Sequence, residues 1–221
     1  MTPLASLYLF LLGLASGLAL LALTSYRRIS PMWLRWLLFV SGAFVISRYV
    51  TLALFTQARA TQQFWALRHC WLATSVGLTL PSVIAVDQLV RHPAMTPKKL
   101  FRWYAPFLLA YLLVMFFGRF TPMPDPLIGW SLRLNPPWRW LLCLVQGVFV
   151  IGFVGLCVFL IRQLPSSSVR LALAGLVIAH LALACDGLLL AFGGWYVRPF
   201  LFSEMLTLIA LWHAFSTAAI T

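Results

Sequence analysis

The chain has 221 residues, of which 62% are hydrophobic and only 9% are charged. A soluble domain carries roughly a quarter charged residues, so this composition excludes a soluble globular protein. The net charge of +12 does not indicate nucleic-acid binding, because the positive residues stand at the ends of apolar segments rather than on one soluble face. We expect them to anchor the chain at membrane lipid headgroups.

Long apolar runs follow one another along the chain, each near the roughly 20 residues that cross a bilayer. The first run is followed, not preceded, by its arginines, which favours a retained helix over a signal peptide. The sequence predicts an all-α integral membrane protein, a bundle of seven transmembrane helices forming a single domain over residues 1–221. These helices are expected at residues 3–24, 32–55, 65–89, 101–118, 138–162, 170–192 and 197–219.

The distribution of lysine and arginine predicts the orientation of the bundle. The loops after the second, fourth and sixth helices contain or border six basic residues. Those after the first, third and fifth have nine: Arg27, Arg28, Arg35, Arg91, Lys98, Lys99, Arg102, Arg162 and Arg170. Because basic loops stay in the cytoplasm, we expect the N-terminus outside, the C-terminus in the cytoplasm, and a location in the plasma membrane.

Two other segments carry specific expectations. Gly13 and Gly17 form a GxxxG pattern in the first helix, which we interpret as a site of internal helix packing. The connection RFTPMPDPLIGWSLRLNPPWRW, residues 119–140, contains five prolines and three tryptophans. It is expected to be a stiff loop against the membrane interface, with aromatic anchors. A lid over an external cavity is the alternative.

Ionisable residues inside the predicted spans point to a polar layer. The chain has only four acidic residues: Asp125 is in the external loop and Asp87 at the cytoplasmic end of the third span, which leaves Asp186 and Glu204 in the membrane interior together with Arg48. Counting about 1.5 Å per residue places all three roughly 6–12 Å below the outer surface. Charged groups at such depth pair with one another or mark a functional site.

Two interpretations of this layer remain open. Arg48 could pair with Asp186 or Glu204 only to fix helix packing. Alternatively, a water-accessible pocket open to the outside could bind a small ligand or ion. In the second case the candidate ligand-binding residues are Arg48, Asp186, Glu204, His69, Arg68 and Gln146.

Histidine placement raises the question of haem. Only His180 and His213 are expected near each other, differing by roughly 6 Å in depth at 1.5 Å per residue. We therefore expect hydrogen-bonded interior histidines, no metal site and no cofactor. The sequence has no HExxH, P-loop or GxSxG motif, and we predict that the protein is not an enzyme.

The segment WLATSVGLTLPSVIAVDQLVRHPAMTPKKLFRWYAPFLLAYLL, in which an apolar helix with a central proline leads into a short basic turn, resembles the seven-transmembrane sensory input modules of bacterial histidine kinases. The resemblance is otherwise architectural. It implies a bacterial inner-membrane sensor of a ligand or of the membrane state. The chain ends at HAFSTAAIT without a coiled coil or kinase, so we expect an isolated module or a separate partner protein.

These observations favour a non-enzymatic sensor or binding module with a polar pocket in its outer half. It would relay to a cytoplasmic partner through the basic loops and the last helix. One alternative is a structural or accessory subunit of a larger membrane complex. Another is a small transporter, which would require polar groups continuing inward along Ser75, Thr79 and Ser82 to Asp87.

Overall fold

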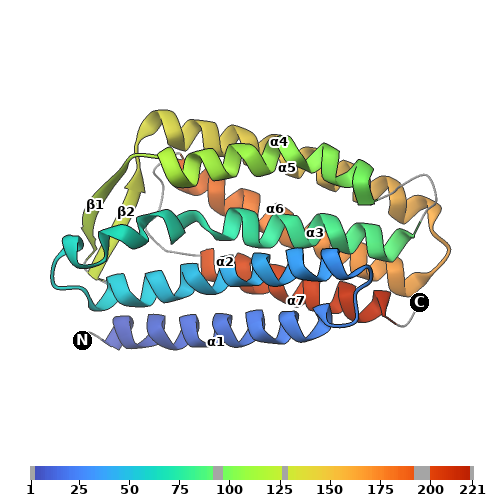
Figure 1. Cartoon of the computed structure of the whole chain (residues 1–221), viewed down its shortest axis with the longest axis horizontal. Coiled ribbons are helices and arrows are strands. Elements are labelled where there is room, and N and C mark those ends of the chain that lie inside the picture. The colour runs from blue at the N-terminus through green and yellow to red at the C-terminus, as the bar shows by residue number, and fades with distance from the viewer. Residues whose placement is uncertain (1–2, 92–96, 126–128, 192–199, 220–221) are drawn as a thin grey trace.

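The computed structural model describes residues 3–91, 97–125, 129–191 and 200–219 (Figure 1). Its helices run side by side in alternating directions, so that both ends of the bundle collect connections from distant parts of the chain. The elements, in chain order, are α1 (Pro3–Tyr26), α2 (Met32–Gln57), the 3₁₀ helix η1 (Thr61–Leu72), α3 (Thr74–Val90), α4 (Pro97–Phe117), β1 (Phe120–Asp125), β2 (Gly129–Leu134), α5 (Pro136–Gln163), α6 (Ser167–Ala191) and α7 (Phe200–Ala218).

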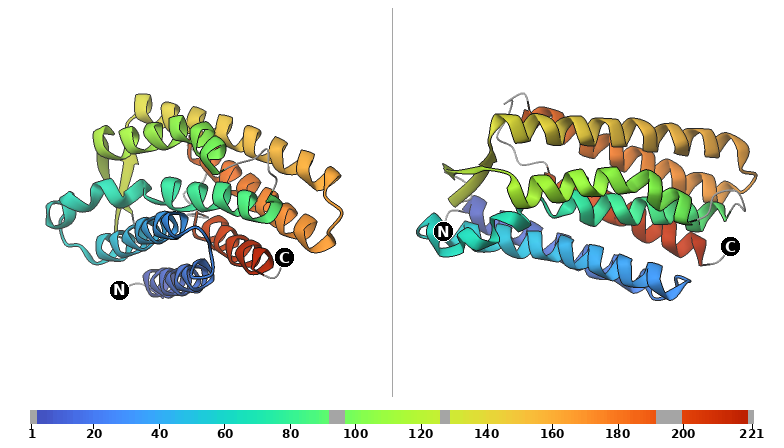
Figure 2. Two further views of the ribbon diagram at one scale, coloured as in Figure 1. Left: turned by 45° about the vertical axis from the view of Figure 1, so that its right-hand side comes forward. Right: turned by 45° about the horizontal axis from the view of Figure 1, so that its top comes forward.

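The described chain is that of an all-α, multi-pass membrane protein. Six of its helical segments are long and apolar enough to cross a membrane, and the apolar part of α4, Phe101–Phe117, is shorter. Helix α3 lies in the middle and contacts α2, α4 and α7, while the first helix, α1, packs against the last, α7 (Figure 2). The many exposed leucines and phenylalanines suit a lipid environment.

The predicted third helix differs from expectation at its start. Residues 61–72 form 3₁₀ rather than α-helix, with non-helical backbone angles at Phe64, and the α-helix begins only at Thr74. Long 3₁₀ segments are uncommon because their hydrogen bonds are poorly aligned. Helix α3 then continues through Pro81 to Val90. The change in helix type at Ala73 gives the chain an irregular backbone beside α2.

Glycines in the bundle do not serve the purpose expected from the GxxxG pattern. A Cβ atom on Gly13 or Gly17 would meet nothing within 4 Å, so this face of α1 points away from the other helices. The buried face of α1 carries small alanines instead: Ala5, Ala15, Ala19 and Ala22. The interpretation of Gly13 and Gly17 as an internal packing site is therefore wrong, because the opposite side of the helix is the one that packs.

The proline-rich connection between α4 and α5 folds into an antiparallel β-hairpin, which the sequence did not reveal. Its end of the molecule is called the hairpin end below. Phe120 of β1 pairs with Leu134 of β2, and both side chains are buried. Gly129 begins β2 with a φ of 83°, and a Cβ there would lie 2.9 Å from the carbonyl oxygen of Thr56. The hairpin thus packs closely onto the last turn of α2.

The prolines of β1 prevent a further strand from pairing with its outer edge. Asn135 donates its backbone N–H to the carbonyl of Arg119 at 2.9 Å, which fixes the alternation of hydrogen bonds in the hairpin. Residues at odd positions of β1 then bond to β2, and Pro122 and Pro124 face outward. Since proline has no N–H, no further strand can pair with this edge in a regular ladder.

Candidate functional site

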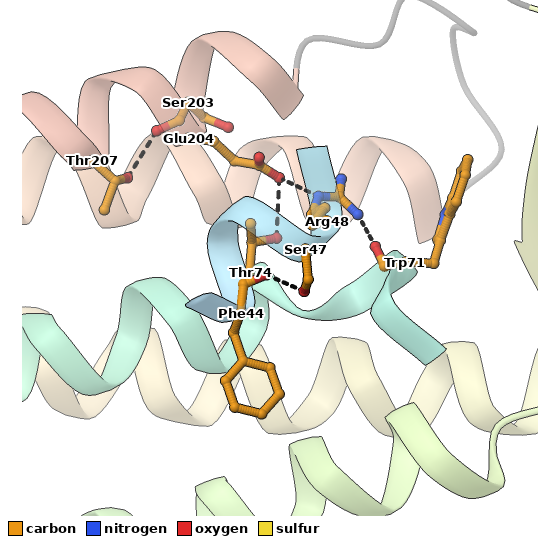
Figure 3. Close-up of polar contacts among 8 residues, drawn as sticks. All are labelled: Phe44, Ser47, Arg48, Trp71, Thr74, Ser203, Glu204 and Thr207. Carbon is orange, nitrogen blue, oxygen red and sulfur yellow. Dashed lines mark hydrogen bonds and ion pairs between the residues drawn. The ribbon is translucent and has the colours of Figure 1, made fainter. Parts of the chain in front are cut away.

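A buried ion pair joins α2 to α7 near the hairpin end. The Nε atom of Arg48 lies 3.0 Å from Oε1 of Glu204, and the side chains are only 8% and 3% exposed (Figure 3). Counted along each helix, Arg48 lies about 14 Å from the end of α2 and Glu204 about 6 Å from the start of α7. Of the two acids considered from the sequence as partners of Arg48, the structure pairs it with Glu204.

Two further bonds connect this pair to the junction of η1 and α3. Thr74, the first residue of α3, donates its hydroxyl to Glu204 Oε1 at 3.1 Å. Arg48 donates from Nη1 to the backbone carbonyl of Trp71. Carbonyls in the last turn of a helix have no N–H group of a following turn to bind. The end of η1 at Leu72 therefore places an acceptor where the guanidinium needs one.

One side of the pair is left without hydrogen bonds. The Tyr49 hydroxyl interacts electrostatically with the Glu204 carboxylate. Yet neither Tyr49 Oη nor Glu204 Oε2 has a partner in hydrogen-bonding geometry, although both are buried. Among the described residues only five buried side-chain atoms share this property. Such atoms cost free energy unless something satisfies them, so two of them at one site are notable.

Asp186 does not take part in the ion pair. Its side chain is half-buried on α6 and bonds to Ser203, the residue before Glu204 on α7. In the described parts of the chain, the bond between Arg48 and Glu204 is the one salt bridge. Asp186 thus links α6 to α7 beside the pair, while Arg48 has a single acidic partner.

The other predicted site residues have partners of their own. His69 on η1 forms a 2.8 Å hydrogen bond from Nδ1 to the carbonyl of Met115 on α4. Arg68 lies over the ring of Trp65, 5.3 Å from its centroid, and donates to that residue's carbonyl. These contacts join η1 to α4 and to itself. That Arg68 and His69 line a ligand site remains a prediction.

Gln146 on α5 also bonds elsewhere, accepting a 2.6 Å hydrogen bond at Oε1 from the hydroxyl of Tyr111 on α4. Tyr111 is 1% exposed. Replacing Tyr111 with phenylalanine is expected to lower the free energy of unfolding by about 1–3 kcal/mol, because the amide oxygen of Gln146 loses its donor. Unfolding by SDS titration in mixed micelles measures this loss. Gln146→Leu combined with Tyr111→Phe should recover part of it, and a double variant that is less stable than Tyr111→Phe would contradict the explanation.

The structure separates the two histidines considered for haem. A Cβ on Gly175 of α6 would lie 3.9 Å from the Cβ of Ala210 of α7, so these two residues share a level. His180 lies five residues from Gly175 toward the hairpin end, and His213 three residues from Ala210 in the opposite direction. At 1.5 Å per residue the two are about 12 Å apart along the bundle, not 6 Å. This pair cannot ligate one iron.

His180 is hydrogen-bonded in the interior, as expected. Its Nδ1 lies 3.0 Å from the carbonyl of Leu176, and its ring packs on that of Phe153 at 4.4 Å between centroids. Because a carbonyl only accepts, Nδ1 carries the proton. In the described residues no group of three or more histidine, cysteine or acidic side chains could hold a metal ion.

Three residues of the site were not identified from the sequence: Tyr49, Trp71 and Thr74. Tyr49 follows Arg48 directly, and neighbours in a helix point about 100° apart, so periodicity did not join them. Trp71 contributes a backbone carbonyl, for which the sequence offers no signal. Thr74 could have been found, since it is a polar residue in the apolar run of the third predicted span.

No protein-family model, curated protein or solved structure matches this chain. The function proposed below therefore rests on the chemistry and placement of its own residues.

Proposed function

We propose that the chain is a non-enzymatic membrane sensor or binding module that spans a plasma membrane, the bacterial inner membrane, seven times. In addition to the six long apolar segments, α4 would cross the membrane. Its 21 residues correspond to about 31 Å, close to the thickness of the hydrocarbon core. Its first residues include Lys98 and Lys99, which can extend toward the headgroups along their aliphatic stems.

The placement of charge supports an N-terminus outside and a C-terminus in the cytoplasm. The ends of α1, α3 and α5 lie at the end of the bundle opposite the hairpin (Figure 1). The exposed basic residues near this end are Arg27, Arg28, Arg91, Lys98, Lys99, Arg102, Arg162 and Arg170. Basic residues of this density favour the cytoplasmic face, so the hairpin would be external.

The observation that carries the proposal is the buried pair of Arg48 and Glu204, which ties α2, α7 and the start of α3 together. At the opposite end, Arg91 donates from Nη2 to the carbonyl of Ala218 at 2.8 Å, so α3 is also bonded to the end of α7. A polar ligand that enters from the hairpin end and binds Arg48 or Glu204 would break the bond between them. Helix α7 would then remain bonded to α3 through Arg91 at its other end. The change would reach a cytoplasmic partner through α7.

The test is ligand-induced stabilisation of the purified chain. Three probes cover the possible charges: glycine as a zwitterion, acetate as an anion and methylammonium as a cation. A probe present at 100 times its dissociation constant should add about 2.7 kcal/mol to the free energy of unfolding. The effect should vanish in the double variant Arg48→Met, Glu204→Leu and persist in Arg133→Gln, which changes an exposed hairpin residue. No stabilisation by any probe, or stabilisation that survives the double variant, would overturn the proposal.

A second candidate, a structural or accessory subunit of a larger membrane complex, is favoured by one observation. Arg48 and Glu204 already bond to each other and to Trp71 and Thr74. Such a pair needs no ligand to hold the helices. For a subunit, all three probes leave unfolding unchanged, and the chain purifies from its native membrane with fixed protein partners.

A further inference from the structure

The carboxylate of Glu204 is unequally surrounded. Oε1 accepts hydrogen bonds from Arg48 Nε at 3.0 Å and from Thr74 Oγ1 at 3.1 Å, whereas Oε2 accepts none. Glu204 is 2% exposed, so water of the bulk does not complete its shell. Oε1 therefore already accepts two hydrogen bonds, whereas Oε2 has no hydrogen bond and can still bind a proton.

The group that faces this carboxylate is the hydroxyl of Tyr49. It is buried, 1% exposed as a residue, and interacts with Glu204, although the two groups are not in full hydrogen-bonding geometry. A phenol hydroxyl can donate to a carboxylate or accept from a carboxylic acid. The guanidinium of Arg48 can only donate. The Thr74 hydroxyl also has both capacities but already bonds to Oε1, so Tyr49 is the neighbour we expect to serve Oε2 in both protonation states of Glu204.

The titratable groups around Glu204 come from few elements. From α2 these are Arg48 and Tyr49, and from α1 Tyr8, which interacts with Tyr49. Helix α3 contributes the uncharged Thr74. Asp186 of α6 bonds to Ser203 rather than to Glu204. Among the described residues, Arg48 is therefore the single cation bonded to Glu204 and opposes its protonation.

We propose that Glu204 is a proton-binding site, in which Oε2 takes up one proton from hydronium, releases water, and donates the resulting hydrogen bond to Tyr49 Oη. No electron is transferred, and the only bonds that change are those to the proton. Protonation removes the counter-charge of Arg48, which keeps its bond to the Trp71 carbonyl. The ligand of the site is then the proton, and its binding weakens the link between α2 and α7.

This inference rests on the proposed function only in one respect: that breaking the bond between Arg48 and Glu204 produces a signal through α7. Proton binding by Glu204 does not depend on it. Its test needs no external ligand, so it can fail while a probe binds, or succeed while none does. Infrared difference spectra between neutral and acidic pH detect the carbonyl stretch of a newly protonated carboxyl group. The chain has only four acidic residues, so Asp87→Asn, Asp125→Asn and Asp186→Asn together leave Glu204 as the sole acidic side chain.

In lipid vesicles, this triple variant should show an acid-induced carboxyl band. Adding Tyr49→Phe should shift the band, since the acid loses its acceptor, and adding Glu204→Gln should remove it. Tyr111→Phe, which alters another buried tyrosine, is the matched control and should leave the band in place. The C-terminal carboxyl group does not respond to Tyr49→Phe. If Glu204→Gln fails to fold, the shift with Tyr49→Phe still decides. Absence of the band, or a band that Tyr49→Phe does not move, would overturn the assignment.

Discussion

Alanine in place of Glu204 is expected to lower the free energy of unfolding by about 3–5 kcal/mol, among the largest effects of any single substitution in this chain. The reason is the charge that stays behind: Arg48 is 7% exposed and would have no counter-charge. Thr74 would also lose its acceptor. SDS titration of the purified protein, followed by tryptophan fluorescence, measures the change.

The double variant Arg48→Met, Glu204→Leu separates the pair itself from the cost of breaking it. Removing both charges leaves no buried ion, so the loss should be well below the sum of the two single losses. What remains is the Trp71 carbonyl, which loses its donor, and the Thr74 hydroxyl, which loses its acceptor, each at a cost of about 1–3 kcal/mol. Asp186→Ala, at a half-buried acid outside the pair, is the control and should cost less than Glu204→Ala. Additive single losses would refute the explanation.

Among the glycines inside the described helices, Gly77 is expected to tolerate alanine least. A Cβ at Gly77 would lie 2.9 Å from the carbonyl oxygen of Ser41 and 3.1 Å from the backbone nitrogen of Val45. These are backbone atoms of α2, so the helices must separate to make room. Overpacking of this kind costs about 1–3 kcal/mol, more than the roughly 1 kcal/mol that alanine gains over glycine in a helix.

Two other glycines provide matched controls for Gly77→Ala. Gly13→Ala adds a methyl group where nothing lies within 4 Å, so it should be neutral or stabilising by up to about 1 kcal/mol. Gly42→Ala would meet the side chain of Leu23, which can change rotamer, and should fall between the two. The same SDS titration ranks all three. Equal stability of Gly77→Ala and Gly13→Ala would show that α2 and α3 are not in close contact at this point.

The helical bundle and the charged residues of its polar core, Arg48 and Glu204, could be predicted from the sequence. Both follow from the cost of placing polar groups in a membrane. A run of about 20 apolar residues has few alternatives to a membrane helix, and a buried arginine needs an acid. With two acids predicted in the membrane interior, Glu204 was one of two candidates for Arg48. Depth counted from helix ends placed them at one level, which the ion pair confirms.

Features that depend on tertiary contacts could not be predicted. The amino-acid composition of residues 61–72 does not distinguish a 3₁₀ helix from an α-helix, and the segment runs almost directly into α3. The hairpin contains Pro122 and Pro124, which argue against a strand until its free edge is known. The prediction of a helix-packing site at Gly13 and Gly17 was wrong because a pattern of small residues does not show which side of α1 faces the other helices.

The distance along the chain between the charged partners bears on how the protein is made. Arg48 and Glu204 are 156 residues apart, so at about 5–20 residues per second the arginine is synthesised about 8–31 s before its acid. The Trp71 carbonyl follows after only 23 residues, or about 1–5 s. Of the two acceptors that Arg48 bonds to, this carbonyl is therefore synthesised first. The bond from Arg48 to Trp71 can therefore form before α7, which carries Glu204, has been synthesised.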